Sequence, residues 1–149
     1  MALETYRYEA SAHRPSSWEV ALGVHGGVID LMEQAQRGLP AGAFDRFGRL
    51  IDVPREELAA AIHTTTRTIS RRREAKKPLD RTSSERLVRL ALLYRRASEV
   101  FGDEALARQW MQTPRATFGG RTPFQLASSE IGAQEVEDVL LRVEHGVFY

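Results

Sequence analysis

The chain has 149 residues, a length that fits one domain or two small domains sharing a core. Hydrophobic residues make up 42% and charged residues 28%, and no run of 18 apolar residues occurs, so a membrane-spanning helix is excluded. The absence of cysteine excludes disulfides, thiolate metal sites and cysteine nucleophiles. The first ten residues carry charges where a signal peptide needs a continuous apolar stretch, and we expect a cytoplasmic protein.

The net charge of +1 conceals a strong segregation along the chain. Residues 1–54 sum to −2, residues 55–96 to +7 and residues 97–149 to −4. A basic middle segment between acidic flanks indicates a surface that binds a polyanion, separate from a second surface with a different function. The alternative is an arginine-rich helical face that is simply solvated.

The first expected element is a loose N-terminal arm, residues 1–26, in which an Arg-Pro-Ser-Ser stretch and several glycines break any period. Apolar residues at helical spacing then predict a short amphipathic helix over residues 28–35, stopped by Gly38-Leu39-Pro40. A second set of apolar residues predicts a helix of about three turns over residues 44–51.

The pattern after residue 53 is typical of a helix-turn-helix. Pro54 is expected as the first residue of its first helix, and a break at His63-Thr64 separates this helix from a second one, from about Thr66 to Ala75. Two helices that cross steeply need a small side chain at their closest approach, and Ala59 provides it. The predicted buried positions of the motif are Leu58, Ala59, Ile62 and Ile69.

The second helix of this motif presents short hydroxyls and arginines, which suit the base edges and phosphates of a DNA major groove. We therefore predict a DNA-binding surface made of Thr65, Thr66, Arg67, Ser70, Arg71, Arg72, Arg73, Lys76 and Lys77. Three positions depart from the usual pattern: His63 occupies a turn where glycine is commonest, and Thr64 and Arg72 replace apolar residues. The alternative is a plain αα-hairpin with a solvated basic face.

A long helix is predicted next, from a capping box at Thr82-Ser83-Ser84-Glu85 to about Phe101. Its apolar residues cover more than one stripe, so we expect it to be buried on most sides as a spine joining two subdomains. We also expect part of it to meet a second copy of the chain, through Leu90, Leu93, Tyr94 and Ala97.

The remaining segments are also predicted to be helical. Asp103 is expected to cap one helix, Thr122-Pro123-Phe124-Gln125 forms a capping box for another, and Gly146 ends the last. Trp110 and Phe124 are expected in the core. No segment alternates like a strand, so the predicted fold is all-α, with a helix-turn-helix region at residues 27–82 and a second helical region at residues 83–149.

No arrangement of residues indicates catalysis. The four histidines lie too far apart in the sequence for metal-ligand spacing. The glycine pair at residues 119–120 follows no strand and matches neither a P-loop nor a dinucleotide-binding motif. We therefore predict a protein that is not an enzyme and holds no metal or cofactor.

Several linked motifs lie in the last third of the chain: Val100-Phe101-Gly102-Asp103, Trp110-Met111-Gln112-Thr113-Pro114, residues 118–126, residues 135–140, and the ending Glu144-His145-Gly146-Val147-Phe148-Tyr149. In this order they resemble the Xre/MbcA/ParS toxin-binding domain of bacterial antitoxins. The resemblance continues upstream through the helix-turn-helix to about Gly27, and so covers about four-fifths of the chain. It implies an Xre-like helix-turn-helix region joined by the long helix to a toxin-binding region.

The resemblance further implies a type II toxin–antitoxin module whose toxin carries a RES domain and consumes NAD⁺. Such an antitoxin binds its toxin directly and represses its own operon, so the implied partners are the toxin and operator DNA. In the family the C-terminal region covers the entrance to the toxin's active site. Here the implied toxin contacts are Arg121, Glu144, Gly146, Val147, Phe148 and Tyr149.

Two alternatives concern these contacts. The apolar tail could fold back on its own core; we favour contact with the toxin, because an apolar aromatic chain end rarely stays free in water. The Gly119-Gly120-Arg121 segment could serve only as the bend before the Thr122 cap.

We predict an antitoxin and autoregulator that forms a homodimer, because the long helix has more apolar surface than one subunit needs; the dimer would also pair two recognition helices across a palindromic site. Two other functions stay open at this point: a stand-alone dimeric repressor without a toxin, and an adaptor that binds a protein partner and no DNA.

Overall fold

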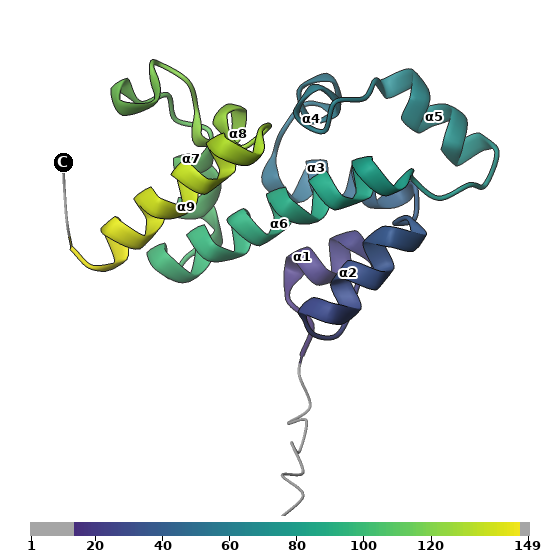
Figure 1. Cartoon of the computed structure of the whole chain (residues 1–149), viewed down its shortest axis with the longest axis horizontal. Coiled ribbons are helices and arrows are strands. Elements are labelled where there is room, and N and C mark those ends of the chain that lie inside the picture. The colour runs from purple at the N-terminus through teal and green to yellow at the C-terminus, as the bar shows by residue number, and fades with distance from the viewer. Residues whose placement is uncertain (1–13, 147–149) are drawn as a thin grey trace, which may run out of the picture.

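The structure is a computed structural model that describes residues 14–146, and every regular element within that range is helical (Figure 1). This confirms the prediction of an all-α fold. None of the helices in the described range is long and apolar enough to cross a membrane. In chain order the elements are α1 (Ser17–Leu22), α2 (Val28–Arg37), α3 (Gly42–Ile51), α4 (Arg55–Ala61), α5 (Thr66–Glu74), α6 (Arg81–Phe101), α7 (Glu104–Met111), the 3₁₀ turn η1 (Ala116–Phe118), α8 (Pro123–Leu126) and α9 (Glu130–Glu144).

The long helix α6 crosses the middle of the molecule, with α1, α2, α3, α7 and α9 packed around it (Figure 1). Its 21 residues include Leu87, Ala91 and Ala97, which are completely buried. The sequence prediction that this helix is a spine buried on most sides is therefore confirmed.

The residues predicted to meet a second copy lie in this same core. Leu90, Leu93, Tyr94 and Ala97 are each at most 5% exposed, because the surrounding helices of the same chain cover them. Leu90, Tyr94 and Ala97 could touch another copy only if the core opened, and Leu93 exposes only its edge to a groove beside α2. The prediction that these four residues form a dimer surface is wrong.

The start of α6 also differs from the sequence prediction. The N-cap is Asp80, whose carboxylate accepts a hydrogen bond from the Ser83 backbone N–H at 3.1 Å. Partial burial alone would raise the pKa of Asp80, but hydrogen bonds from Ser83, helped by nearby Arg72, lower this pKa below its ordinary value. Ser84 is buried and accepts a hydrogen bond from the Leu39 N–H at 2.9 Å. The predicted capping box at Thr82 is wrong, because aspartate caps equally well and lies two residues earlier.

Two other predicted caps are confirmed. The Asp103 carboxylate accepts from the Leu106 N–H at 3.1 Å at the start of α7. Thr122 and Gln125 form the reciprocal capping box of α8, with both hydrogen bonds at 3.0 Å.

Helix α1 was not expected from the sequence. Its Trp18 and Leu22 are buried in the main core, and the Arg46 side chain on α3 donates to the Ala21 carbonyl at 2.8 Å. Gly23 ends the helix with a φ of 68°, so this glycine is a cap and not a sign of a loose segment. The prediction of a loose arm is wrong for residues 17–24, and residues 1–13 of that arm lie outside the described residues.

One hydrophobic core runs through both predicted regions. Phe44 and Phe47 from α3 belong to the same core as Trp110 and Phe124 from the C-terminal region, which confirms the predicted burial of the last two. The side-chain amide of Gln112, just after α7, donates to the Ile51 carbonyl at the end of α3 at 2.5 Å. The two regions therefore share one packed interior.

Candidate functional site

The helix-turn-helix is formed by α4 and α5. Its predicted buried residues Leu58, Ala59, Ile62 and Ile69 are all buried. His63 in the turn adopts a φ of 59°, in the left-handed region that favours glycine. The turn thus has the backbone geometry of the motif, and the unusual histidine does not prevent it.

The side chains of Arg67 and Arg71 are exposed on α5 and have no hydrogen-bond or ion-pair partner in the described part of the chain. Lys76 and Lys77, just beyond the end of α5, are exposed as well. Arg67, Arg71, Lys76 and Lys77, for which residues 14–146 supply no side-chain partner, therefore project from one short stretch of the fold. Such a stretch attracts phosphates and suits the entry of α5 into a DNA groove.

Three of the other predicted DNA contacts are engaged within the protein. The Thr65 hydroxyl caps α5 by accepting from the Thr68 N–H at 3.1 Å. Arg72 donates to the Pro78 carbonyl at 2.9 Å and so holds the loop between α5 and α6. Arg73 pairs with Asp45. The remaining two of the predicted DNA contacts, besides the four exposed cations, are Thr66 and Ser70, which are both half-buried.

Asp45 ties both helices of the motif to α3. Its carboxylate is only 11% exposed, and lies 2.7 Å from Nε of Arg55 and 3.2 Å from Nη1 of Arg73. Arg55 is the first residue of α4 and Arg73 lies in the last turn of α5. Asp45 and Arg55 were not among the functional residues predicted from the sequence. The available signal was a carboxylate between Phe44 and Phe47 on an otherwise apolar helix face.

The C-terminal region forms a groove beside Arg121. Gly119 and Gly120 bend the chain with φ values of 63° and 80°, which leaves the Arg121 side chain exposed. A groove of about 870 Å³ lies between this bend and α9, and we call it the Arg121 groove. Its α9 wall carries Ile131, which is 86% exposed. The buried face of this helix consists of Gly132, Ala133, Val136 and Leu140.

Glu144, another predicted toxin contact, is bound to α6. Arg96 Nη1 donates to one carboxylate oxygen of Glu144 at 3.2 Å, and Arg96 Nη2 donates to the other. Hydrogen bonding by Arg96 lowers the pKa of Glu144 below its ordinary value. The bidentate pair holds the last turn of α9 against α6. Gly146, with a φ of 72°, is exposed just after the end of the helix. Val147, Phe148 and Tyr149 lie outside the described residues.

A hydrogen bond also joins the helix-turn-helix to the C-terminal region. The ring Nε2–H of His63 donates to the Ser128 carbonyl, in the loop before α9, at 2.8 Å. The turn between α4 and α5 is therefore in direct contact with the segment that opens α9. Among residues 14–146, no group of three or more histidine or acidic side chains is placed to hold a metal ion.

Comparison with known proteins matches two segments of the chain to family models. Residues 30–92 match the model of the antitoxin Xre-like helix-turn-helix domain, and residues 96–146 match that of the antitoxin Xre/MbcA/ParS C-terminal toxin-binding domain. A protein of Yersinia enterocolitica named antitoxin Xre is 32% identical over 131 residues, which cover 87% of this chain and 88% of that protein. The chain belongs to the Xre antitoxin family.

Two further relatives carry the same name. The Pseudomonas putida protein is 36% identical over 80 residues, 54% of this chain and 50% of the relative. The Photorhabdus laumondii protein is 29% identical over 111 residues, 74% of this chain and 75% of the relative. Membership in this family makes the chain an antitoxin with a DNA-binding helix-turn-helix and a toxin-binding domain. The two matched segments meet inside α6, where one ends at residue 92 and the other begins at residue 96.

Proposed function

We propose that this antitoxin neutralises a RES-domain toxin that degrades NAD⁺, by covering the entrance to the toxin's active site. The observation that carries the proposal is the match of residues 96–146 to a toxin-binding domain that ends immediately before an apolar, aromatic tail. The specific class of toxin follows from the resemblance of the C-terminal motifs to the antitoxins of that module.

In this mechanism the tail enters the toxin and the groove surface supports it. Helix α9 ends at Glu144, and Val147, Phe148 and Tyr149 follow shortly after it in the sequence. Buried aromatic side chains are the usual anchors of a protein interface. Ile131 and Arg121, on either side of the Arg121 groove, add an exposed apolar and an exposed charged contact on the same domain.

Truncation of the tail tests the mechanism. An antitoxin lacking residues 147–149 should still co-purify with the toxin encoded by the neighbouring gene, because an anchor is only part of the contact surface. NAD⁺ loss and growth arrest should nevertheless return on co-expression. Phe148→Asp should act similarly, because it places an unpaired carboxylate in an apolar contact.

The exposed Leu106 on α7 provides a control, since Leu106→Asp should leave inhibition unchanged. Full inhibition by the truncated protein overturns the proposed blocking role. A lower melting temperature with retained inhibition would instead mean that the tail packs on its own core. Failure of the neighbouring protein to co-purify, with operator binding retained, would favour a stand-alone repressor.

We further propose that the antitoxin represses its own operon as a homodimer, with Arg67 and Arg71 in the major groove of each half-site. Lys76 and Lys77 are proposed to contact phosphates, so neutralising both should weaken binding to all sequences alike and reduce its salt dependence. A gel-shift assay with the antitoxin's own promoter measures both effects. Equal binding by the wild-type and the lysine-neutralised proteins across a salt series would contradict this role.

A further inference from the structure

Helix α2 exposes more apolar surface than its place in the fold requires. Leu31 and Ala35 are buried toward α6, as expected for an amphipathic helix. On the first two turns of the same helix, however, Val28, Ile29 and Met32 are 67%, 73% and 55% exposed. Scattered exposed apolar residues are ordinary, but three large ones on neighbouring turns form a patch, which is a mark of an interaction surface.

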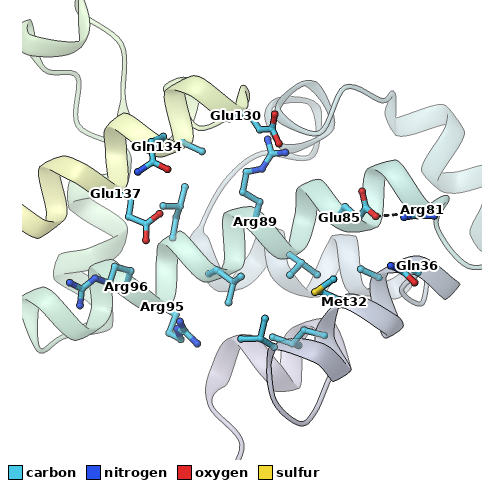
Figure 2. Close-up of a pocket in the computed structure, with 17 residues that line it drawn as sticks. Met32, Gln36, Arg81, Glu85, Arg89, Arg95, Arg96, Glu130, Gln134 and Glu137 are labelled. Carbon is cyan, nitrogen blue, oxygen red and sulfur yellow. Dashed lines mark hydrogen bonds and ion pairs between the residues drawn. The ribbon is translucent and has the colours of Figure 1, made fainter.

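The patch continues into a groove of about 620 Å³ that follows α6 between α2 and α9 (Figure 2). We call it the α2–α9 groove. Val88 and Leu92 of α6 contribute apolar surface to it. Figure 2 shows Arg89 directed from α6 toward Glu130 of α9, and Arg95 on α6 nearer to α2. The groove therefore combines an apolar floor with four arginines of α6, and three glutamates, Glu85, Glu130 and Glu137, line it as well.

We propose that a second copy of this chain docks here, with α2 of each copy lying in the α2–α9 groove of the other. Beside its apolar patch, α2 carries two exposed acidic residues: Asp30, which accepts from the Gly27 N–H at the start of the helix, and Glu33, which forms an exposed pair with Arg37 at 3.4 Å. These charges complement the arginines of α6, just as the patch complements the apolar floor. One surface thus holds both halves of a complementary pair, which is the requirement for a two-fold symmetric interface, where every contact occurs twice.

This arrangement leaves the other two surfaces accessible. In Figure 1, α5 and α2 lie on opposite sides of α6, so a copy seated on α2 does not cover Arg67 or Arg71. Helix α9 turns Ala133 and Glu137 toward the α2–α9 groove but Ile131 toward the Arg121 groove. A dimer built in this way can hold DNA and toxin at the same time.

The inference rests on the proposed homodimer and gives it an interface that the core residues Leu90, Tyr94 and Ala97 cannot provide. The first test is the doubly substituted full-length chain Ile29→Glu/Met32→Glu, studied without toxin by sedimentation or light scattering. We expect the wild-type chain to be a dimer at tens of micromolar and the variant to be a monomer, because four carboxylates would enter an apolar contact. Both substituted side chains are exposed, so the melting temperature of the isolated fold should stay nearly unchanged.

Leu106→Glu, an equivalent change on the exposed surface of α7, is the matched control and should remain a dimer. The natural chain contains no cysteine, which permits a second and independent test. Residues near a two-fold axis face their own copies, so Met32→Cys should be cross-linked to a covalent dimer by a short bis-maleimide. Leu106→Cys should not.

Each outcome decides the matter. A wild-type chain that is monomeric at these concentrations overturns both the interface and the homodimer. A wild-type dimer that survives Ile29→Glu/Met32→Glu overturns the interface and leaves the homodimer standing. A variant that stays dimeric but no longer captures the toxin would assign the face to the toxin instead. Loss of the dimer together with cross-linking at residue 32 supports the proposal.

Discussion

Replacing Asp45 with asparagine tests how the helix-turn-helix is held against α3. The substitution keeps the size of the side chain but removes the charge that attracts Arg55 and Arg73, at 2.7 Å and 3.2 Å. Both arginines then lose their ion pair with α3. We therefore expect α4 and α5 to be held less firmly, with consequences for both stability and DNA binding.

The size of the effect follows from exposure. The two arginine side chains are 45% and 65% exposed, so solvent screens each pair, and such a pair contributes about 0.2–1 kcal/mol. Because the shared carboxylate is nearly buried, we take the upper part of that range for each pair, which gives a loss of about 1–2 kcal/mol. For a chain of this size the melting temperature should fall by about 2–8 °C.

The control is Glu85→Gln, which removes the same charge from the exposed ion pair between Arg81 and Glu85. Its melting temperature should stay within error of the wild type. Operator affinity is then measured by fluorescence anisotropy at one fixed salt concentration. Loss of a negative charge should by itself strengthen binding to DNA, which is a polyanion. Weaker operator binding by Asp45→Asn but not by Glu85→Gln would therefore indicate that α5 is displaced. If both variants melt and bind operator alike, the role of Asp45 is refuted.

Three further predictions concern other parts of the fold. Arg67→Ala and Arg71→Ala should each weaken operator binding, measured by anisotropy, by about 1–3 kcal/mol for every base contact that the substitution removes. Toxin inhibition should be unaffected. Operator binding equal to the wild type would mean that α5 does not contact the DNA bases. Since the folded-state pKa of Asp80 is lowered, its ionised form adds stability above the ordinary carboxyl pKa, and this stability is lost as the pH falls through the lowered value. Asp80→Asn keeps an N-cap acceptor but loses the charge, so it should melt below the wild type at neutral pH and lose less stability on acidification, and identical acid unfolding curves would contradict this. A Cβ at Gly132 would lie 1.8 Å from the Leu126 carbonyl oxygen, so Gly132→Ala should force α8 from α9 and lower stability by about 1–3 kcal/mol; an unchanged melting curve would show that this close approach relaxes easily.

The parts of the fold that the sequence predicted are those with local signals. Asp103 and Thr122 cap helices because an acceptor side chain lies three residues before the N–H that it binds. Leu58 and Ile69 were assigned to the core because helical periodicity depends on near neighbours in the chain. Signals of this kind need no knowledge of distant contacts. They predicted the helix-turn-helix and its turn at His63 even where the residue type was unusual.

The parts that could not be predicted depend on distant partners or on very short segments. Helix α1 has only six residues, too few to show a period, and the glycine that caps it looked like a break. Asp45 pairs with Arg73, which is 28 residues away. The apolar residues of α6 indicated burial, but a pattern does not say whether the covering surface belongs to the same chain. The assignment of Leu90 and Leu93 to a second copy failed for this reason, while the exposed Ile29 of α2 went unnoticed.

Because α6 belongs to both functional regions, its length sets the angle between them. An α-helix advances 1.5 Å and turns by about 100° with each residue, and the matched DNA-binding and toxin-binding segments meet within this one helix. One residue inserted between Leu92 and Arg96 would rotate α7 to α9 by more than a quarter turn about α6, whereas a loop would absorb the same insertion. The hydrogen bonds from His63 to Ser128 and from Gln112 to Ile51 fit only one such register. The number of residues in α6 therefore sets the direction in which a captured toxin faces relative to the operator.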